Sequence, residues 1–391
     1  MAHVFTRRYR PMALVAAAIP FLLTPMAIEG QMQGVDAQRI ATLLVERMAL
    51  TRGERVFLLV APGEADSLIT PLRAAIRGAG AVDLGALSTK GPEPAAWATD
   101  WTRASHGLTG PALEAHVRTA DLGIMLPGAT PADSAYAAMQ AVLRSGKGRT
   151  VHFHWAGAYG LDGLLQPMTP SRSQFYENVL RHTDYGALMA AQGRLESAMR
   201  GHPIRVTTPG GTDLTFQIGE RPITRQDGEA SLARAKRARN LIDREVELPA
   251  GAIRVAPIEN SVNGTVAFPA GEWGGERVDG LVMTFVKGRL TRFTTRTGRA
   301  GVERELVSGG DAARAFREFA LGMNPLLAIP ESGERWIPYY GYGAGVVRLS
   351  LGDNTELGGL VGGGYVRWNF FTDATVTVGA DVWVRGGRLV R

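Results

Sequence analysis

Two histidines two positions apart are the first residues whose spacing suggests chemistry. His152 and His154 lie in the apolar segment TVHFHWAG, which is typical of a β-strand. Alternate residues of a strand point to the same side, so both imidazoles could bind one metal ion. Histidines in such a segment more often belong to the core or its rim, and we take that as the first interpretation. The sequence contains no G-x-S-x-G motif, which disfavours a serine-hydrolase nucleophile.

The composition excludes several other kinds of site and partner. The 391 residues include no cysteine, which excludes disulfides, thiolate metal sites and cysteine nucleophiles. The net charge is +6, but no run of lysine and arginine is interleaved with aromatic residues, so nucleic acid is not an expected partner. Hydrophobic residues make up 45% of the chain and charged residues 20%, as in soluble globular proteins.

The first thirty residues have the pattern of a signal peptide. Three arginines precede an apolar run at 12–28, which Pro20 and Pro25 interrupt. The run is short for a membrane-spanning helix and has the length of a signal-peptide core. We therefore expect residues 1–30 to be a signal peptide or an N-terminal membrane anchor. The protein is then exported to the periplasm or cell surface, where residues 12–28 could tether it to the membrane.

Helices and strands alternate in the first half of the chain. Apolar residues at helical spacing predict helices at 36–50, 67–80 and 185–201. Between them lie short apolar runs bounded by glycine or proline, which predict buried strands. These runs are at 54–62, 81–87, 120–128 and 148–157. Such alternation predicts an α/β domain with a mostly parallel sheet over residues 35–200.

The second half, residues 201–391, changes to a period of two. The segment 204–221 has the pattern of a hairpin, and several later segments alternate in the same way. One helix is predicted at 310–322, in GDAARAFREFALG. This half is therefore expected to be an α+β domain rich in antiparallel strands.

Four segments of the second half carry a resemblance to a known family. In chain order they are RVTTPGGTDLTF at 205–216, ELPAGAIRVAPIENSVNGTVAF at 247–268, AFREFALGMNP at 315–325 and GAGVVRLSLGDNTELGG at 343–359. Together they resemble the thermophilic metallo-aminopeptidases of the two-metal, leucyl aminopeptidase type, and their relatives the dihydroxypyridine dioxygenases. With the α/β first half, the resemblance covers nearly the whole chain after residue 30.

The resemblance implies a centre in which carboxylates and imidazoles hold divalent metal ions that polarise a carbonyl group and activate water. Five positions of this chain correspond to ligands of the family. A glutamate is replaced by Ala252, a second glutamate is retained as Glu318 on the predicted helix, and a histidine is replaced by Arg348. The histidine and aspartate of an H-x-D motif are replaced by Arg367 and Asn369.

These replacements indicate a degenerate metal site. Arginine stays protonated and offers no lone pair to a metal, alanine has no ligand atom, and asparagine is a weak neutral donor. We therefore expect no metal and no other cofactor. A buried carboxylate without its metal needs another cation, so we predict that Glu318 pairs with Arg348, Arg367 or both. The two arginines could instead form a binding site for a carboxylate or phosphate.

The function expected from the resemblance is that of a pseudoenzyme. It would be a non-catalytic, exported binding or structural protein, with a membrane-extrinsic subunit of a larger complex as one form. The partner would be another protein or a membrane complex, and a homodimer is also consistent with the family. Aromatic residues cluster near the former site and suit a core or an interface: Trp336, Tyr339, Tyr340, Tyr342 and Trp368.

Two alternatives remain open at this point. The first is a metal-dependent aminopeptidase or related metalloenzyme with relocated ligands, drawn from His152, His154, His182 and His202. The second is an anion or peptide binder that uses Arg348 and Arg367 in the inherited cleft.

Overall fold

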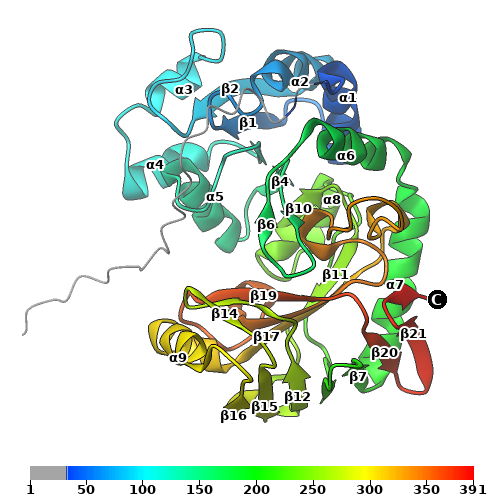
Figure 1. Cartoon of the computed structure of the whole chain (residues 1–391). Helices are drawn as coiled ribbons and strands as arrows, with labels where there is room; N and C mark the ends of the chain where they lie inside the picture. Colours follow the sequence, from blue (N-terminus) through cyan, green and yellow to red (C-terminus); the bar gives the residue numbers. More distant parts are fainter. Residues whose placement is uncertain (1–31, 33) are drawn as a thin grey trace, which may run out of the picture.

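The structure is a computed structural model that describes Met32 and residues 34–391, so the predicted signal peptide or anchor at 1–30 lies outside the described residues. One part of the fold is a parallel sheet with helices, and the other is built from antiparallel sheets (Figure 1). The predicted fold class, α/β followed by a strand-rich α+β region, is confirmed. No helix within the described residues is long and apolar enough to cross a membrane.

The parallel sheet has the strand order β10-β4-β3-β1-β2. Its strands are β1 (Arg55–Val60), β2 (Val82–Ser88), β3 (Leu122–Met125), β4 (Arg149–Phe153) and β10 (Glu245–Leu248). The helices of this region are α1 (Ala37–Met48), α2 (Asp66–Gly78), α3 (Asp100–Ala104), α4 (Gly110–Val117), α5 (Ser134–Arg144), α6 (Pro170–His182) and α7 (Tyr185–Gly201). Both faces of β1 are apolar: Leu58 packs in one core with α1 and α2, and Leu59 in a second core with α4 and α5. This is why β1 has a continuous apolar sequence.

One strand of the parallel sheet comes from far along the chain. β10 pairs in parallel with β4, and Glu247 lies opposite His152. The range 35–200 therefore contains four of the five strands, and residues 245–248 supply the edge strand. The two halves of the chain share this sheet.

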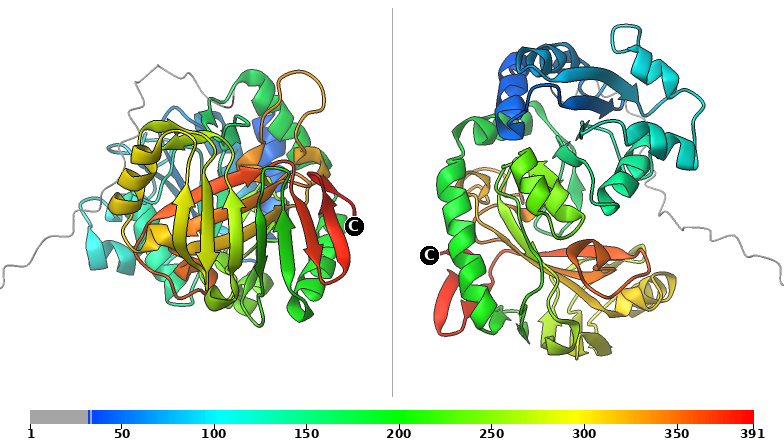
Figure 2. Two further views of the ribbon diagram at one scale, coloured as in Figure 1. Left: turned by 60° about the horizontal axis from the view of Figure 1, so that its bottom comes forward. Right: turned by 180° about the vertical axis from the view of Figure 1, so that it is seen from behind.

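Two antiparallel sheets form the rest of the fold (Figure 2). One of them has five strands in the order β19-β18-β17-β11-β9. Its strands are β9 (Ile223–Arg225), β11 (Ala252–Val255), β17 (Phe316–Gly322), β18 (Val347–Gly352) and β19 (Val366–Phe371). The other sheet has eight strands in the order β16-β15-β12-β8-β7-β20-β21-β22. Its strands are β7 (Ile204–Thr207), β8 (Asp213–Phe216), β12 (Asn263–Ala267), β15 (Val282–Val286), β16 (Arg289–Thr294), β20 (Thr375–Val378), β21 (Asp381–Arg385) and β22 (Arg388–Leu389). The two sheets pack through aromatic side chains, with the ring of Phe216 5.3 Å from that of Phe319.

Short elements complete the chain. Two hairpins are formed by β5 (Ala158–Tyr159) with β6 (Leu165–Gln166), and by β13 (Gly271–Trp273) with β14 (Glu276–Val278). The remaining helices are α8 (Leu232–Arg237), α9 (Arg299–Ser308) and the 3-10 turns η1 (Ile242–Arg244), η2 (Glu259–Ser261), η3 (Ala312–Arg314), η4 (Pro325–Leu327), η5 (Tyr339–Gly341) and η6 (Thr355–Leu357).

The prediction of a helix at 310–322 is wrong, because most of this segment forms a strand. The helix of this region, α9, ends at Ser308, and Glu318 lies on the strand β17. All seven residues of β17 are buried, and the strand pairs with β11 on one side and β18 on the other. A strand buried on both faces has no alternating pattern, so its sequence resembles a short buried helix.

Candidate functional site

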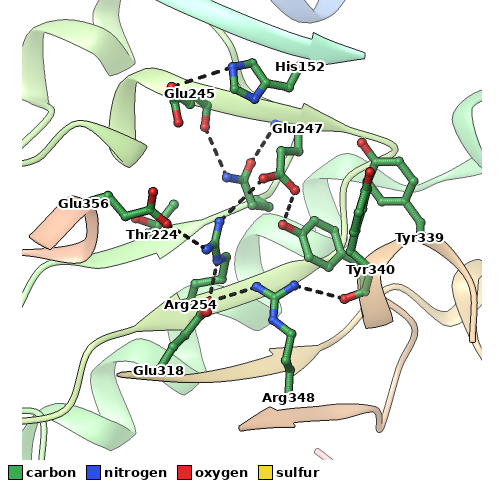
Figure 3. A network of polar contacts seen from close by, with 12 residues as sticks. His152, Thr224, Glu245, Glu247, Arg254, Glu318, Tyr339, Tyr340, Arg348 and Glu356 are labelled. Carbon is green, nitrogen blue, oxygen red and sulfur yellow. Dashed lines mark hydrogen bonds and ion pairs between the residues drawn. The ribbon is translucent and has the colours of Figure 1, made fainter. Parts of the chain in front are cut away.

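Three neighbouring strands bring one carboxylate and two guanidinium groups together. Glu318 on β17 is fully buried, and its Oε1 accepts a hydrogen bond of 2.6 Å from Nε of Arg254 on β11. The same oxygen accepts a bond of 2.9 Å from Nη2 of Arg348 on β18 (Figure 3). The other oxygen, Oε2, accepts a hydrogen bond of 3.3 Å from the Ser350 hydroxyl. Both carboxylate oxygens therefore already have donors.

A β-bulge adds a third guanidinium. The pairing of β17 with β18 shifts between Phe316 and Glu318, which leaves Arg317 as the extra residue. A bulge redirects the side chain of the inserted residue. Here Nε of Arg317 lies 3.6 Å from Oε2 of Glu318, and its Nη2 donates to Glu356 of η6. Glu356 also lies 3.5 Å from Arg254, so it joins the cluster from the loop side.

The arginines decide the protonation of Glu318. Burial by itself would raise the pKa of Glu318, but the charges of Arg254, Arg348 and Arg317 outweigh burial and hold the pKa well below its usual range. Burial likewise opposes the charge of Arg254, but Glu318 and the other nearby acids raise the pKa of Arg254 well above its ordinary value. Glu318 is therefore a carboxylate whose charge is neutralised by protein cations.

A further acid extends this cluster toward the parallel sheet. Oε1 of Glu247 on β10 lies 3.5 Å from Arg254, and its Oε2 accepts a hydrogen bond from the Tyr342 hydroxyl. The three arginines of the cluster thus face three carboxylates: Glu247, Glu318 and Glu356. A charge-balanced cluster needs no further cation to be stable in the interior.

The two histidines selected from the sequence lie beside this cluster as neutral groups. His152 and His154 are in edge contact, with ring centroids 5.2 Å apart. Burial, then the charges of His154 and Arg254, hold the pKa of His152 well below its ordinary value, and burial lowers that of His154. Nε2 of His152 lies 3.7 Å from Glu245, whose pKa is raised to about 8 by burial and by Glu356. His152 and His154 are therefore both uncharged at neutral pH.

The other predicted site residues are placed around Glu318 but do not all reach it. Arg348 pairs with Glu318 as expected, whereas Arg367 does not. Arg367 lies over the Trp273 ring at 3.5 Å and binds Glu305 at 2.7 Å, while its Nε donates to Asn369. β19 is separated from β17 by β18, so Arg367 finds its partner on α9 instead.

Arg254 is the site residue that the sequence reasoning missed. It lies two residues after Ala252 on β11, so both side chains share one face of the strand. The register places Ala252 opposite Gly322 and Arg254 opposite Ala320, two positions from Glu318. A charged residue inside the apolar strand sequence AIRV was the available signal, because buried charges are rare unless paired.

The remaining histidines lie elsewhere. His182 and His202 are exposed at the ends of α6 and α7, and Nδ1 of each lies 3.0 Å from a backbone carbonyl oxygen. Neither joins His152 and His154.

The aromatic cluster contributes walls to the site. Tyr339 and Tyr342 are buried in the core, and the Tyr340 carbonyl accepts a hydrogen bond of 3.1 Å from Arg348. The Arg348 guanidinium lies 4.8 Å from the centre of the Trp368 ring, and Trp368 itself remains 36% exposed. Tyr339 and Tyr342 of this aromatic cluster therefore belong to the core, whereas Trp368 is partly on the surface.

The donor set around Glu318 does not suit a divalent metal ion. Metal ligands must offer lone pairs, but the nearest neighbours of Glu318 are guanidinium groups, which are cationic and only donate. Within the described residues, no three side chains of the histidine, aspartate, glutamate or cysteine type converge as a metal site. The groups around Glu318 hold a buried carboxylate in place by donating hydrogen bonds to it.

Comparisons with known proteins show what this chain is similar to. Neither the protein-family models nor the curated proteins gave a match. Among solved structures, 2,5-dihydroxypyridine dioxygenase from Pseudomonas putida superposes with a TM-score of 0.58 at 15% identity, covering 91% of this chain and 98% of the dioxygenase. AmpT, an aminopeptidase of Thermus thermophilus, superposes with a TM-score of 0.58 at 17% identity, covering 91% of this chain and 99% of AmpT. The chain thus has a metallo-peptidase-like fold over nearly its whole length.

Proposed function

We propose that this chain is a non-catalytic protein on a metallo-peptidase-like scaffold, which acts as an exported binding or structural protein. The observation that supports this proposal is the enclosure of Glu318 by Arg254 and Arg348. Glu318 is the one acid that the resemblance retains among the five ligand positions. In this chain its oxygens bind guanidinium groups at 2.6 and 2.9 Å.

The substitution pattern has a consistent electrostatic reason. Metal ions neutralise buried carboxylates in a metallo-hydrolase, and a carboxylate left alone in the interior is costly. An arginine in place of a histidine supplies that charge permanently, because it does not deprotonate. We infer that this cluster neutralises Glu318 without a metal ion.

Metal content tests the proposal directly. Elemental analysis of protein purified without a histidine tag is expected to give less than about a tenth of an equivalent of zinc, manganese or iron per chain. A parallel assay with amino-acid amides, with and without a chelator, is expected to show no chelator-sensitive cleavage. A full equivalent of metal together with chelator-sensitive cleavage would establish the enzyme alternative instead.

The anion-binding alternative has less support. Both arginines that it requires already have partners: Arg348 binds Glu318 and the Tyr340 carbonyl, and Arg367 binds Glu305 and the Glu272 carbonyl. A charge reversal, Arg367→Glu, should abolish binding of inorganic phosphate or an acidic peptide if that alternative holds.

The location of the protein and its partners belong to the same proposal. The basic and apolar pattern of residues 1–30 supports export, with retention at the membrane through residues 12–28. A membrane-extrinsic subunit of a larger complex and a homodimer are the two assemblies we propose. Cell fractionation with mass analysis of the mature N-terminus tests the first, and analytical ultracentrifugation tests the second.

A further inference from the structure

Glu356 differs from the other two carboxylates of the arginine cluster because it reaches the surface. Its side chain is 36% exposed, against 15% for Glu247 and 0% for Glu318. The guanidinium groups that it contacts, those of Arg254 and Arg317, belong to side chains that are only 3 and 2% exposed. In Figure 3, Glu356 approaches Arg254 from the side opposite to Tyr340. The Glu356 carboxylate therefore lies between two buried arginines and the solvent.

Glu356 uses only part of the hydrogen-bonding capacity of these arginines. Nη2 of Arg254 and Nη2 of Arg317 both donate to Oε1 of Glu356. Nε of Arg317 is buried and has no hydrogen-bond partner among the described residues, since Oε2 of Glu318 lies 3.6 Å from it. Nε and Nη2 form one edge of a guanidinium group, and a carboxylate binds such an edge most strongly with one oxygen on each nitrogen. Arg317 therefore offers an edge that Glu356 satisfies at only one nitrogen.

Only the side chain of Glu356 has to move to vacate this position. Asn354 and Leu357, which flank it in the loop, are buried and fix the backbone on either side. Nδ2 of Asn354 donates a hydrogen bond of 3.2 Å to Glu259. Rotation of a partly exposed side chain takes picoseconds to nanoseconds. An incoming anion can therefore replace the Glu356 carboxylate without unfolding of the loop.

Charge determines what can take the place of Glu356. With Glu356 in contact, three arginines face three carboxylates. If Glu356 turns into solvent, one cation in the interior is left uncompensated, which is costly. A single negative charge on a planar oxyanion restores the balance and matches the guanidinium edge. Arg348 is different, because its carboxylate partner, Glu318, is fully buried.

We propose that Arg254 and Arg317 form a carboxylate-binding site, which Glu356 occupies in the free protein and from which the carboxylate of a ligand displaces it. The ligand accepts hydrogen bonds from Nη2 of Arg254 and from the Nε–Nη2 edge of Arg317, while the Glu356 side chain turns toward solvent. Because the tethered carboxylate competes, the wild type binds free carboxylates weakly. This inference rests on the binding role proposed above and names the chemical class of the ligand.

Acetate tests the proposal on the full chain, because Glu356→Ala removes a group of the size of acetate. Binding is followed by ligand-detected NMR at constant ionic strength, with chloride as the balancing anion. We expect saturable binding to Glu356→Ala in the millimolar range and at least about tenfold weaker binding to the wild type, in which Glu356 competes. Glu356→Gln should bind acetate less tightly than Glu356→Ala, because the amide fills the same space. The control Glu303→Ala removes an exposed acid of α9 and should behave as the wild type.

Two results would overturn the proposal. One is equal binding of acetate to Glu356→Ala and Glu356→Gln, or binding to neither. The other is the absence of wild-type binding at acetate concentrations about a hundredfold above the Kd of Glu356→Ala, because Glu356 would then not be displaced.

Further measurements separate the remaining explanations. Inorganic phosphate is titrated in the same way, and tighter binding of phosphate than of acetate to Glu356→Ala would contradict the carboxylate assignment. Circular dichroism confirms that each variant is folded. Glu356→Asp is a milder variant whose shorter side chain reaches the arginines less well, so its affinity for acetate should lie between those of the wild type and Glu356→Ala. Metal analysis is independent of these titrations, so failure of the carboxylate site and failure of the non-catalytic assignment are distinguishable.

Discussion

At the scale of single residues, Glu318 is the centre of the buried cluster of ion pairs. It is fully buried and has three guanidinium groups within 3.6 Å. Buried ion pairs add little net stability compared with apolar residues, but removal of one partner leaves uncompensated charge in the interior. The cluster is therefore sensitive to any change of Glu318.

The substitution Glu318→Gln is expected to lower the free energy of unfolding by about 3–5 kcal/mol, because it leaves the guanidinium groups without their central anion. Denaturant unfolding measures this loss. The low pKa of Glu318 stabilises the wild type fully above pH about 4.3, and this contribution is lost as the pH falls toward the folded-state pKa. The variant should lack that acid-dependent loss. As a control, Glu303→Gln breaks an exposed pair with Arg299 and should cost at most about 1 kcal/mol.

Glu245 should have the opposite pH dependence. Its pKa is raised to about 8 in the folded protein, so the folded state retains a proton that the unfolded state loses near pH 4.5. Stability therefore falls as the pH rises from about 4.5 to 8, and this contribution is constant outside that window. Glu245→Gln is expected to flatten this slope, which unfolding curves across the window measure. A variant with the same slope as the wild type would show that Glu245 is ionised in the folded protein.

At the scale of elements, the site depends on the close packing of β18 against β19. Gly352 ends β18 with φ +122°, and a Cβ atom there would lie 1.9 Å from the Tyr365 carbonyl oxygen. Both features require glycine, because other residues rarely adopt this conformation and the neighbouring backbone leaves no space. The register of Arg348 in the sheet is thus linked to a glycine at the end of its strand.

We expect Gly352→Ala to destabilise the protein by at least about 1–3 kcal/mol, the usual cost of a strained residue. Gly362→Ala is the matched control in the following loop, since its added Cβ would meet nothing nearer than 4.0 Å. The control should change stability by no more than about 0.5 kcal/mol. Thermal unfolding of both variants measures the difference, and equal stabilities would refute the role assigned to Gly352.

At the scale of the whole molecule, polar contacts and one hydrophobic core join the parallel sheet to the antiparallel sheets. Arg254 on β11 lies 3.5 Å from Glu247 on β10, which in turn pairs with β4. The same core contains Leu58 of the parallel sheet and Phe319 and Val376 of the antiparallel sheets. The first half of the chain therefore takes the edge strand of its sheet from the second half, and the larger core contains residues of both halves.

The described protein should therefore unfold as one cooperative unit. Hydrogen exchange followed by mass spectrometry is expected to give the same opening free energy for peptides from β1 and from β18, and calorimetry a single transition. A stable intermediate in which only the β1 region is protected would contradict this expectation.

The sequence by itself determined the order and type of most elements, because these follow from local periodicity. The segments 54–62 and 185–201 were predicted as a strand and a helix, and β1 and α7 lie there. The same reasoning failed for β17, where burial on both faces removes the alternation that marks a strand. Likewise, no local signal shows that residues 245–248 return to the first sheet.

In the site, too, some features follow from residue types alone and others depend on the tertiary structure. Residue types alone exclude Ala252, Arg348 and Arg367 as metal ligands, since ligand chemistry is a property of the side chain. Which arginine neutralises Glu318 was decided only by the tertiary structure. Strand order places β11 and β18 beside β17 and leaves β19 one strand further away. Arg254 therefore binds Glu318 while Arg367 binds Glu305, because ion pairing depends on distance in space and not on spacing along the chain.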